Sequence, residues 1–159
     1  MKKLILKFSL HLAVIAFAAF TKWWYVLPVD TVQTFYWGFP FACVGEGWQT
    51  SGALQFFILE TLVDFMFYFL VCYGMVWIIF LIYKIKTVSK LLLKTLWSLT
   101  IFFLILWALI ISFSYPTFYI KRNYDWKILS EGYLFIWQKT PNPDTNQYQP
   151  SENQNFKKN

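Results

Sequence analysis

The stretch FMFYFLVCYGMVWIIFLIY, residues 65–83, is nineteen residues long and contains no charged side chain. At 1.5 Å per residue, a helix of this length spans about 28 Å, close to the thickness of the hydrocarbon core of a bilayer. Glu60 and Asp64 precede the stretch, whereas Lys84 and Lys86 follow it. The sequence therefore predicts a membrane-spanning helix that is acidic before its apolar core and basic after it.

The composition of the whole chain supports a membrane protein. Of the 159 residues, 58% are hydrophobic and 14% are charged, compared with about 25% charged in ordinary soluble domains. Aromatic residues make up 23% of the chain, which suits helices that face lipid and rings that lie at headgroup depth. A soluble fold of this size has too small an interior for so many apolar side chains.

Two further apolar segments accompany the first. Residues 4–20 carry lysines on both sides and are followed by the aromatic residues 23–25, and residues 95–115 are free of charge and end before Pro116. We therefore expect an all-α membrane protein with three transmembrane helices. Their expected ranges are about 4–27, 52–83 and 95–115.

The first segment has a second interpretation as a cleaved secretory signal. A basic start, an apolar middle and the small-residue pattern at 16–18 are typical of such signals. Its length of seventeen residues exceeds the roughly 7 to 15 of a signal core, and bulky aromatic residues surround the cleavage position. These features favour an uncleaved anchor, but the segment alone leaves both interpretations open.

The distribution of lysine predicts the orientation of the helices. Three lysines lie within residues 1–7 and four within 84–94, but only Lys22 lies within 21–52. By the positive-inside rule, the N-terminus and the second connection are cytoplasmic, and the first loop and the C-terminus face outward. The expected location is the bacterial inner membrane, which the chain crosses several times. Three basic residues beyond the third helix (Lys121, Arg122 and Lys127) argue against this orientation.

We expect one domain over residues 1–137 and a separate tail. This domain comprises the three helices, an outer loop at 28–51 and an outer segment at 116–137, whose strand-like composition predicts a small extracytoplasmic β-hairpin. Residues 138–159 are rich in Pro, Asn, Gln and Lys, and such a composition predicts a disordered tail.

The outer loop is rich in aromatic rings, which are costly to expose to water. We expect it to fold back onto the helix ends or to bind a partner. The candidate partner-binding residues are Trp37, Phe39, Pro40 and Trp48.

Glu60 and Asp64 are the candidate functional residues of the second helix. They are four residues apart and therefore lie on one helical face, where a carboxylate at the bilayer centre would cost about 2.5 to 3.5 kcal/mol. They are interpreted as a cation or proton site or as a contact for a partner. The alternative is that both lie at the outer interface, within reach of water. His11, Cys72 and Gly74 are expected to be helix-packing positions.

Several classes of function are disfavoured. The chain lacks Gly-rich phosphate loops, GxSxG and HExxH motifs, and a Cys/His cluster, so we expect no catalytic residues, no cofactor and no metal site. The fourteen Lys and Arg residues are spread over four segments, which argues against binding to nucleic acid. An enzyme is therefore not expected.

A resemblance to other proteins rests on the segment Tyr36-Trp37-Gly38-Phe39-Pro40-Phe41. An acidic position in an aromatic helix follows it about two dozen residues later. Over residues 36–82, the chain resembles short uncharacterised bacterial inner-membrane proteins with a Gly-Phe-Pro element in their first outer loop. This resemblance implies location in the bacterial inner membrane and carries no assigned function.

The sequence supports two hypotheses of function. The first is an accessory or structural subunit of a larger membrane protein complex, with the lipid bilayer and other integral membrane subunits as partners. The alternative is a component of a cation or proton transporter or channel that uses Glu60 and Asp64. Because one copy is too small to form a pathway, this alternative requires a homo-oligomer.

Overall fold

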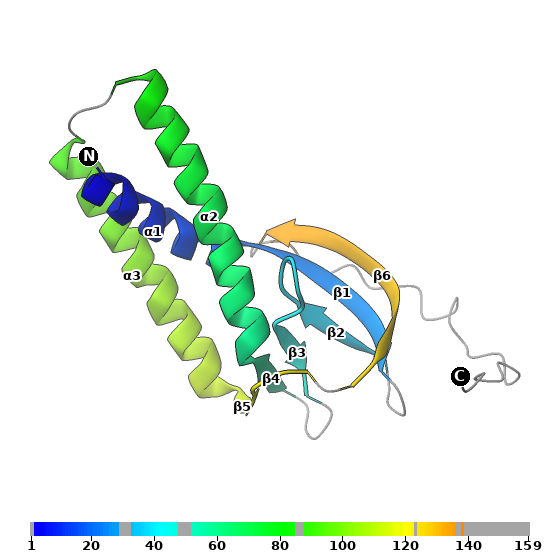
Figure 1. The fold of residues 1–159 in the computed structure, drawn as a ribbon. Helices are drawn as coiled ribbons and strands as arrows, with labels where there is room; N and C mark the ends of the chain where they lie inside the picture. The colour runs from blue at the N-terminus through cyan, green and yellow to red at the C-terminus, as the bar shows by residue number, and fades with distance from the viewer. Residues whose placement is uncertain are drawn as a thin grey trace, which may run out of the picture.

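The computed structural model describes residues 2–28, 33–47, 52–84, 88–122, 124–135 and 138. Three helices form a bundle at one end of the molecule, and a curved sheet lies at the other end (Figure 1). The elements in chain order are α1 (Lys2–Ala19), β1 (Phe20–Pro28), β2 (Thr34–Trp37), β3 (Val44–Glu46), β4 (Ala53–Phe57), α2 (Ile58–Ile82), α3 (Lys90–Phe113), β5 (Tyr115–Tyr119) and β6 (Trp126–Phe135).

The sheet joins strands that are far apart in the sequence. Its order is β5-β4-β3-β2-β1-β6, and all neighbours are antiparallel except β4 and β5, which are parallel. Helix α1 runs directly into β1, β4 runs directly into α2, and one residue separates α3 from β5. As a result, each of the three helices has one end fixed to the sheet.

The expectation of an all-α protein with three transmembrane helices is wrong, because the chain has a mixed α/β fold with a six-stranded sheet. The helix expected at 4–27 ends at Ala19, and the helix expected from 52 begins at Ile58. Residues 23–26 instead pair with β2 and β6, where large aromatic and β-branched side chains pack well on a pleated surface. The aromatic residues 23–25 therefore lie in a strand that is paired on both sides.

The expected extracytoplasmic β-hairpin at 116–137 is also wrong. Both strands exist, but β5 and β6 lie at opposite edges of the sheet and pair with β4 and β1, respectively. Pairing over such sequence distances cannot be read from local composition, which indicates only that a segment suits a strand.

The third helix begins five residues earlier than expected, at Lys90. The Ser89 hydroxyl caps it by accepting a hydrogen bond from the Leu92 N–H at 3.2 Å. Its last residue, Phe113, precedes the strand that contains Pro116. Serine at an N-cap satisfies an N–H group that the helix leaves unpaired, and this explains the early start.

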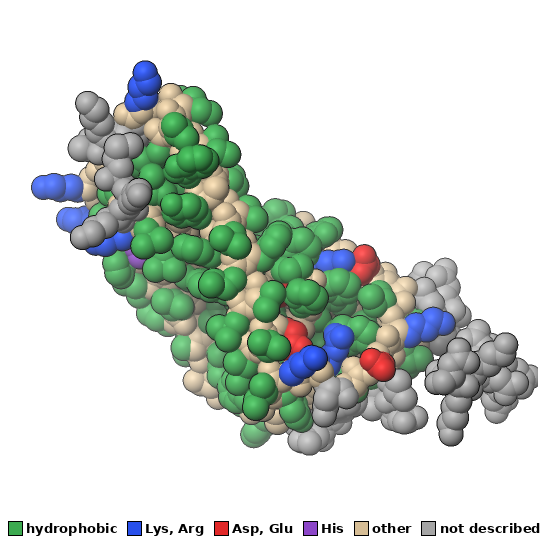
Figure 2. Space-filling model, in the orientation of Figure 1, with side chains coloured by type: hydrophobic (Ala, Val, Ile, Leu, Met, Phe, Trp, Pro, Cys, Tyr) green, Lys and Arg blue, Asp and Glu red, His purple; other side chains and the backbone are tan. Residues whose placement is uncertain are grey.

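Helices α2 and α3 are long and apolar enough to cross a membrane, whereas the apolar part of α1 is shorter. In the most apolar 18-residue window, only 17% of α2 and 6% of α3 is buried within the protein. Leu70 is 65% exposed and Phe113 is 86% exposed. Hydrophobic side chains accordingly dominate the visible surface of the bundle in Figure 2, and lysines lie at its far end.

Two cores cover the two faces of the sheet. Val26, Tyr36 and Phe57 form one core, onto which the segment before β6 folds with Tyr124. On the other face, Val44 and Phe56 pack with Phe17 of α1 and with Trp107 and Ile111 of α3. The second core fixes the helix bundle to the sheet.

Some of the expectations lie outside the described residues. These are the candidate partner contact Trp48 and residues 139–159 of the tail expected at 138–159.

Candidate functional site

Asp64 fastens the second helix to the loop after β2. Its side chain is fully buried, and its Oδ1 accepts a hydrogen bond from the Phe41 N–H at 2.9 Å. Gly38 in the same loop has a φ of +143°, and a Cβ added there would lie 2.9 Å from Asp64 Oδ2 and 2.1 Å from the Phe41 carbonyl oxygen. Glycine is therefore required where the loop backbone closes over the carboxylate.

Glu60 contacts a different part of the chain. Its Oε1 accepts a hydrogen bond from the Arg122 N–H at 3.1 Å, just beyond β5. The two carboxylates share one helical face as expected, but each of them holds a separate backbone segment against the sheet end of α2. These contacts favour a structural role for both residues.

The Gly-Phe-Pro loop folds back onto α2. The Phe39 ring packs edge-on against Phe67 and Tyr68, with ring centroids 5.3 Å and 6.5 Å away. The Phe39–Pro40 peptide bond is cis. Only Phe41 has an exposed side chain among the described aromatic residues of this loop, at 54%. The loop therefore packs on its own helix and leaves one ring free for a partner.

A buried lysine connects β1 to β6. Lys22 is 8% exposed, and its Nζ lies 2.9 Å from Glu131 Oε2 and 3.7 Å from the centre of the Trp24 ring. The indole N–H of Trp24 in turn donates to the Gly38 carbonyl oxygen at 2.9 Å. Lys22, the one lysine that the positive-inside comparison counted within residues 21–52, is thus part of the packing.

Polar side chains also meet inside the first core. The hydroxyl groups of Tyr36 and Tyr124 are 2.7 Å apart, and the Tyr124 hydroxyl donates to Gln55 Oε1 at 3.3 Å. Tyr36 is fully buried, and burial raises the pKa of its phenol. The network consequently stays neutral and serves to position β2, β4 and the segment before β6.

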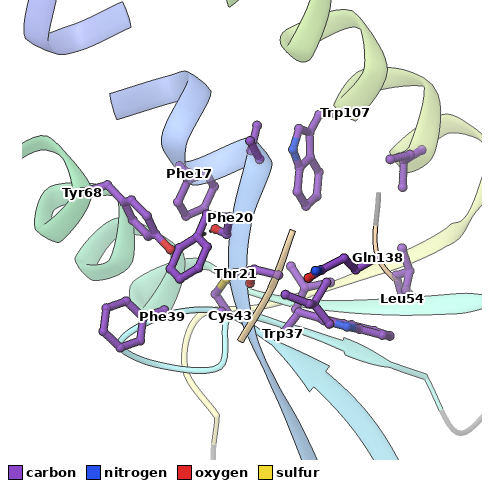
Figure 3. Close-up of a pocket in the computed structure, with 16 residues that line it drawn as sticks. Phe17, Phe20, Thr21, Trp37, Phe39, Cys43, Leu54, Tyr68, Trp107 and Gln138 are labelled. Carbon is purple, nitrogen blue, oxygen red and sulfur yellow. Dashed lines mark hydrogen bonds between the residues drawn. The ribbon is translucent and has the colours of Figure 1, made fainter. Parts of the chain in front are cut away.

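An apolar pocket of about 320 Å³ lies where the helices meet the sheet. Figure 3 shows Trp107 reaching from α3 toward the sheet, and Phe17 at the end of α1 lying near Tyr68 of α2. The wall combines residues from all three helices with residues from five strands. The other labelled lining residues are Phe20, Thr21, Trp37, Phe39, Cys43, Leu54, Tyr68 and Gln138. Sequence reasoning missed this pocket because its wall comes from segments that only the sheet brings together.

Cys43 is the one cysteine at the pocket and is 4% exposed. Burial raises the pKa of its thiol, and the neighbouring Asp64 carboxylate adds to the shift. A neutral, buried thiol is a poor nucleophile. Cys43 therefore packs as a small apolar residue with Val44 and Phe56.

Within the described ranges, no group of three or more His, Cys, Asp or Glu side chains could hold a metal ion. His11 packs edge-on against Trp97, with ring centroids 4.5 Å apart, and is distant from both carboxylates in the sequence. A Cβ added to Gly74 would meet nothing within 4 Å, so the expectation that this glycine marks a close helix contact is wrong. The candidate functional features are therefore the pocket and the hydrogen bonds that Asp64 and Glu60 accept from the backbone. Comparisons with protein-family models, with curated proteins and with solved structures found no match to this chain.

Proposed function

We propose that this chain is a small, non-catalytic accessory subunit of a larger membrane protein assembly. Its α2–α3 hairpin would lie in the bilayer and its sheet would face the outer side of a bacterial inner membrane. The observation that carries the proposal is the exposed apolar surface of α2 and α3, of which only 17% and 6% is buried in their most apolar windows. Such a surface requires lipid or a partner to cover it.

The charges at the two ends of the hairpin support the proposed orientation. Lys84 follows α2, and Lys90 and Lys94 lie in the first turns of α3, at the end of the bundle far from the sheet. The positive-inside rule places this end in the cytoplasm. The sheet would then lie on the outer side, where Lys22 counts little against the rule because it is buried and paired with Glu131.

The outer side offers surfaces for a partner. Strands β5 and β6 are the two edges of the sheet, and Tyr115, Phe118 and Tyr133 are 74%, 59% and 57% exposed there. Exposed edge strands with large aromatic residues are suited to pairing with another chain. An accessory role explains these surfaces without any catalytic group.

The alternative of an oligomeric transporter that uses Glu60 and Asp64 ranks second. An ion pathway needs carboxylates that face water or a partner copy, but Asp64 is fully buried against the Phe41 backbone. Glu60 is bound to the Arg122 backbone. Each contact engages one oxygen of the carboxylate and holds it against the backbone of the chain itself.

Extraction of native membranes into polymer nanodiscs, followed by intact mass spectrometry, tests the proposed function. A complex in which this chain accompanies a larger integral membrane protein at a fixed ratio is the expected result. A complex that contains only copies of this chain would contradict the accessory role and favour the transporter. A variant with Tyr133→Ser and Phe118→Ser should lose the partner while remaining in the membrane. The matched control is Leu70→Ser with Ile82→Ser on the exposed face of α2, away from the sheet.

A further inference from the structure

We propose that the pocket at the junction of helices and sheet binds one acyl chain of a bilayer phospholipid. This inference rests on the proposed membrane placement of α2 and α3. It assigns a lipid ligand to the pocket, which the accessory role does not explain.

The size and lining of the pocket define the chemical class of the ligand. Its volume of about 320 Å³ is at the lower end of the range of ligand sites, which is about 300 to 1,000 Å³. A single hydrocarbon chain suits this volume, whereas a whole phospholipid with two chains does not. The lining side chains Phe17, Val44, Leu54, Trp107, Ile110 and Leu134 offer no charge to a ligand. Filling such a cavity with hydrocarbon is favourable because the apolar wall of the pocket is then shielded from water, while the acyl chain passes from one apolar environment to another.

The pocket wall is continuous with the proposed lipid-facing surface of α3. Ile110 lines the pocket and is also 39% exposed, and its neighbours Leu109 and Phe113 are 49% and 86% exposed. A chain can therefore pass sideways from the bilayer into the pocket without crossing water. This continuity favours a membrane lipid over an amphiphile that arrives from solution.

Of the polar lining groups, Thr21 and Gln138 lie on the sheet side of the pocket, whereas the buried indole N–H of Trp107 lies on the α3 side. Figure 3 places Thr21 and Gln138 beside the strands, opposite the point where Trp107 leaves α3. In the proposed orientation, the sheet side is closer to the headgroups. An acyl chain would thus have its ester end near polar side chains and its methyl end near α3 and α1.

The test uses the full chain in nanodiscs that contain a phosphatidylcholine with a photoreactive diazirine in one acyl chain. After irradiation, mass spectrometry maps the crosslinked residues. We expect pocket residues to be labelled more strongly than the exposed residues of α3 one turn away. Labelling spread evenly over the outer faces of α2 and α3, with the pocket unlabelled, would overturn the proposal.

Two matched alanine variants sharpen the test. Ala19→Phe fills the pocket from the end of α1 and should abolish pocket labelling, since Ala19 belongs to the lining. Ala108→Phe adds the same ring to an exposed position of α3 next to Trp107 and should leave pocket labelling unchanged. Equal labelling of the pocket in both variants would also overturn the proposal. The labelling map of the wild-type protein tests the proposal without either variant. The test therefore still decides the question if Ala19→Phe folds poorly.

The same map separates failure of the site from failure of the membrane placement. If the outer faces of α2 and α3 are labelled and the pocket is not, the membrane placement stands and the acyl-chain site falls. If neither surface is labelled, the membrane placement itself is contradicted and the site falls with it. An unlabelled pocket beside labelled outer faces is also the result expected if a protein segment fills the pocket instead, and it would overturn the proposal.

Discussion

The Oδ1 atom of Asp64 accepts a hydrogen bond from the Phe41 N–H at 2.9 Å, and this bond joins α2 to the loop after β2. The same loop approaches Asp64 closely enough that only glycine fits at position 38. Asp64 therefore has an identified structural role in α2.

Asp64→Ala should destabilise the protein because it leaves the Phe41 N–H without its acceptor. A buried donor without a partner costs about 1 to 3 kcal/mol. Asp64→Asn keeps one oxygen in the side chain and should lower the unfolding midpoint by clearly less than the alanine variant. Thermal unfolding of the detergent-solubilised protein, followed by tryptophan fluorescence, measures both. Equal midpoints for the three proteins, together with loss of an ion flux in Asp64→Asn, would instead support the transporter.

Gly38→Ala should be strongly destabilising, because its Cβ would lie 2.1 Å from the Phe41 carbonyl oxygen and 2.6 Å from the Cys43 nitrogen. Gly74→Ala is the matched control. It lies within α2 with open space around its Cβ, and replacing a helical glycine with alanine stabilises by about 1 kcal/mol. The two changes should thus shift the unfolding midpoint in opposite directions. A tolerated Gly38→Ala would mean that the loop does not close over Asp64 as described.

The contribution of Lys22 should come mainly from its buried stem. Lys22→Met keeps an apolar chain beside Trp24 and removes the pair with Glu131, whose side chain is 46% exposed. Ion pairs with an exposed partner contribute at most about 1 kcal/mol, so this variant should be nearly as stable as the wild type. Lys22→Ala also removes three methylene groups and should cost about 2 kcal/mol. Chemical denaturation compares them, and equal losses would assign the stability to the charge.

Cys43 should make stability fall at alkaline pH. Its thiol has an ordinary pKa of 9.0, and burial raises that pKa in the folded protein. Above pH 9 the unfolded chain releases the proton while the folded protein keeps it, so the free energy of unfolding declines as the pH rises. Below pH 9 both states hold the proton, and the contribution is constant. In a Cys72→Ala background, Cys43→Ala should flatten this decline in unfolding midpoints measured from pH 8 to 10. An unchanged slope would contradict the burial of the thiol.

The apolar runs of α2 and α3 could be predicted from the sequence because length and lack of charge are local properties. The segment at 20–28 could not, since a mostly aromatic and apolar segment after a helix suits the membrane interface as well as a strand. Only its pairing with β2 and β6 decides between the two, and both partners are set by contacts distant in the sequence.

The candidate site likewise combines a feature that the sequence predicts with contacts that it does not predict. The spacing of Glu60 and Asp64 correctly places them on one helical face, but the backbone groups that they bind belong to residues 41 and 122. The pocket depends on the arrangement of three helix ends around one sheet face. Neither arrangement leaves a local pattern in the sequence.

The central claim is that α2 and α3 cross a membrane and that the sheet lies on its outer side. Two single-cysteine variants test this claim in a chain from which Cys43 and Cys72 have been removed. They are Lys127→Cys in β6 and Lys90→Cys at the start of α3, and both positions are exposed. We expect a membrane-impermeant maleimide, applied outside intact cells, to label the cysteine at 127 at once and the cysteine at 90 only after permeabilisation. Labelling of both positions in intact cells, or of position 90 alone, would contradict the claim.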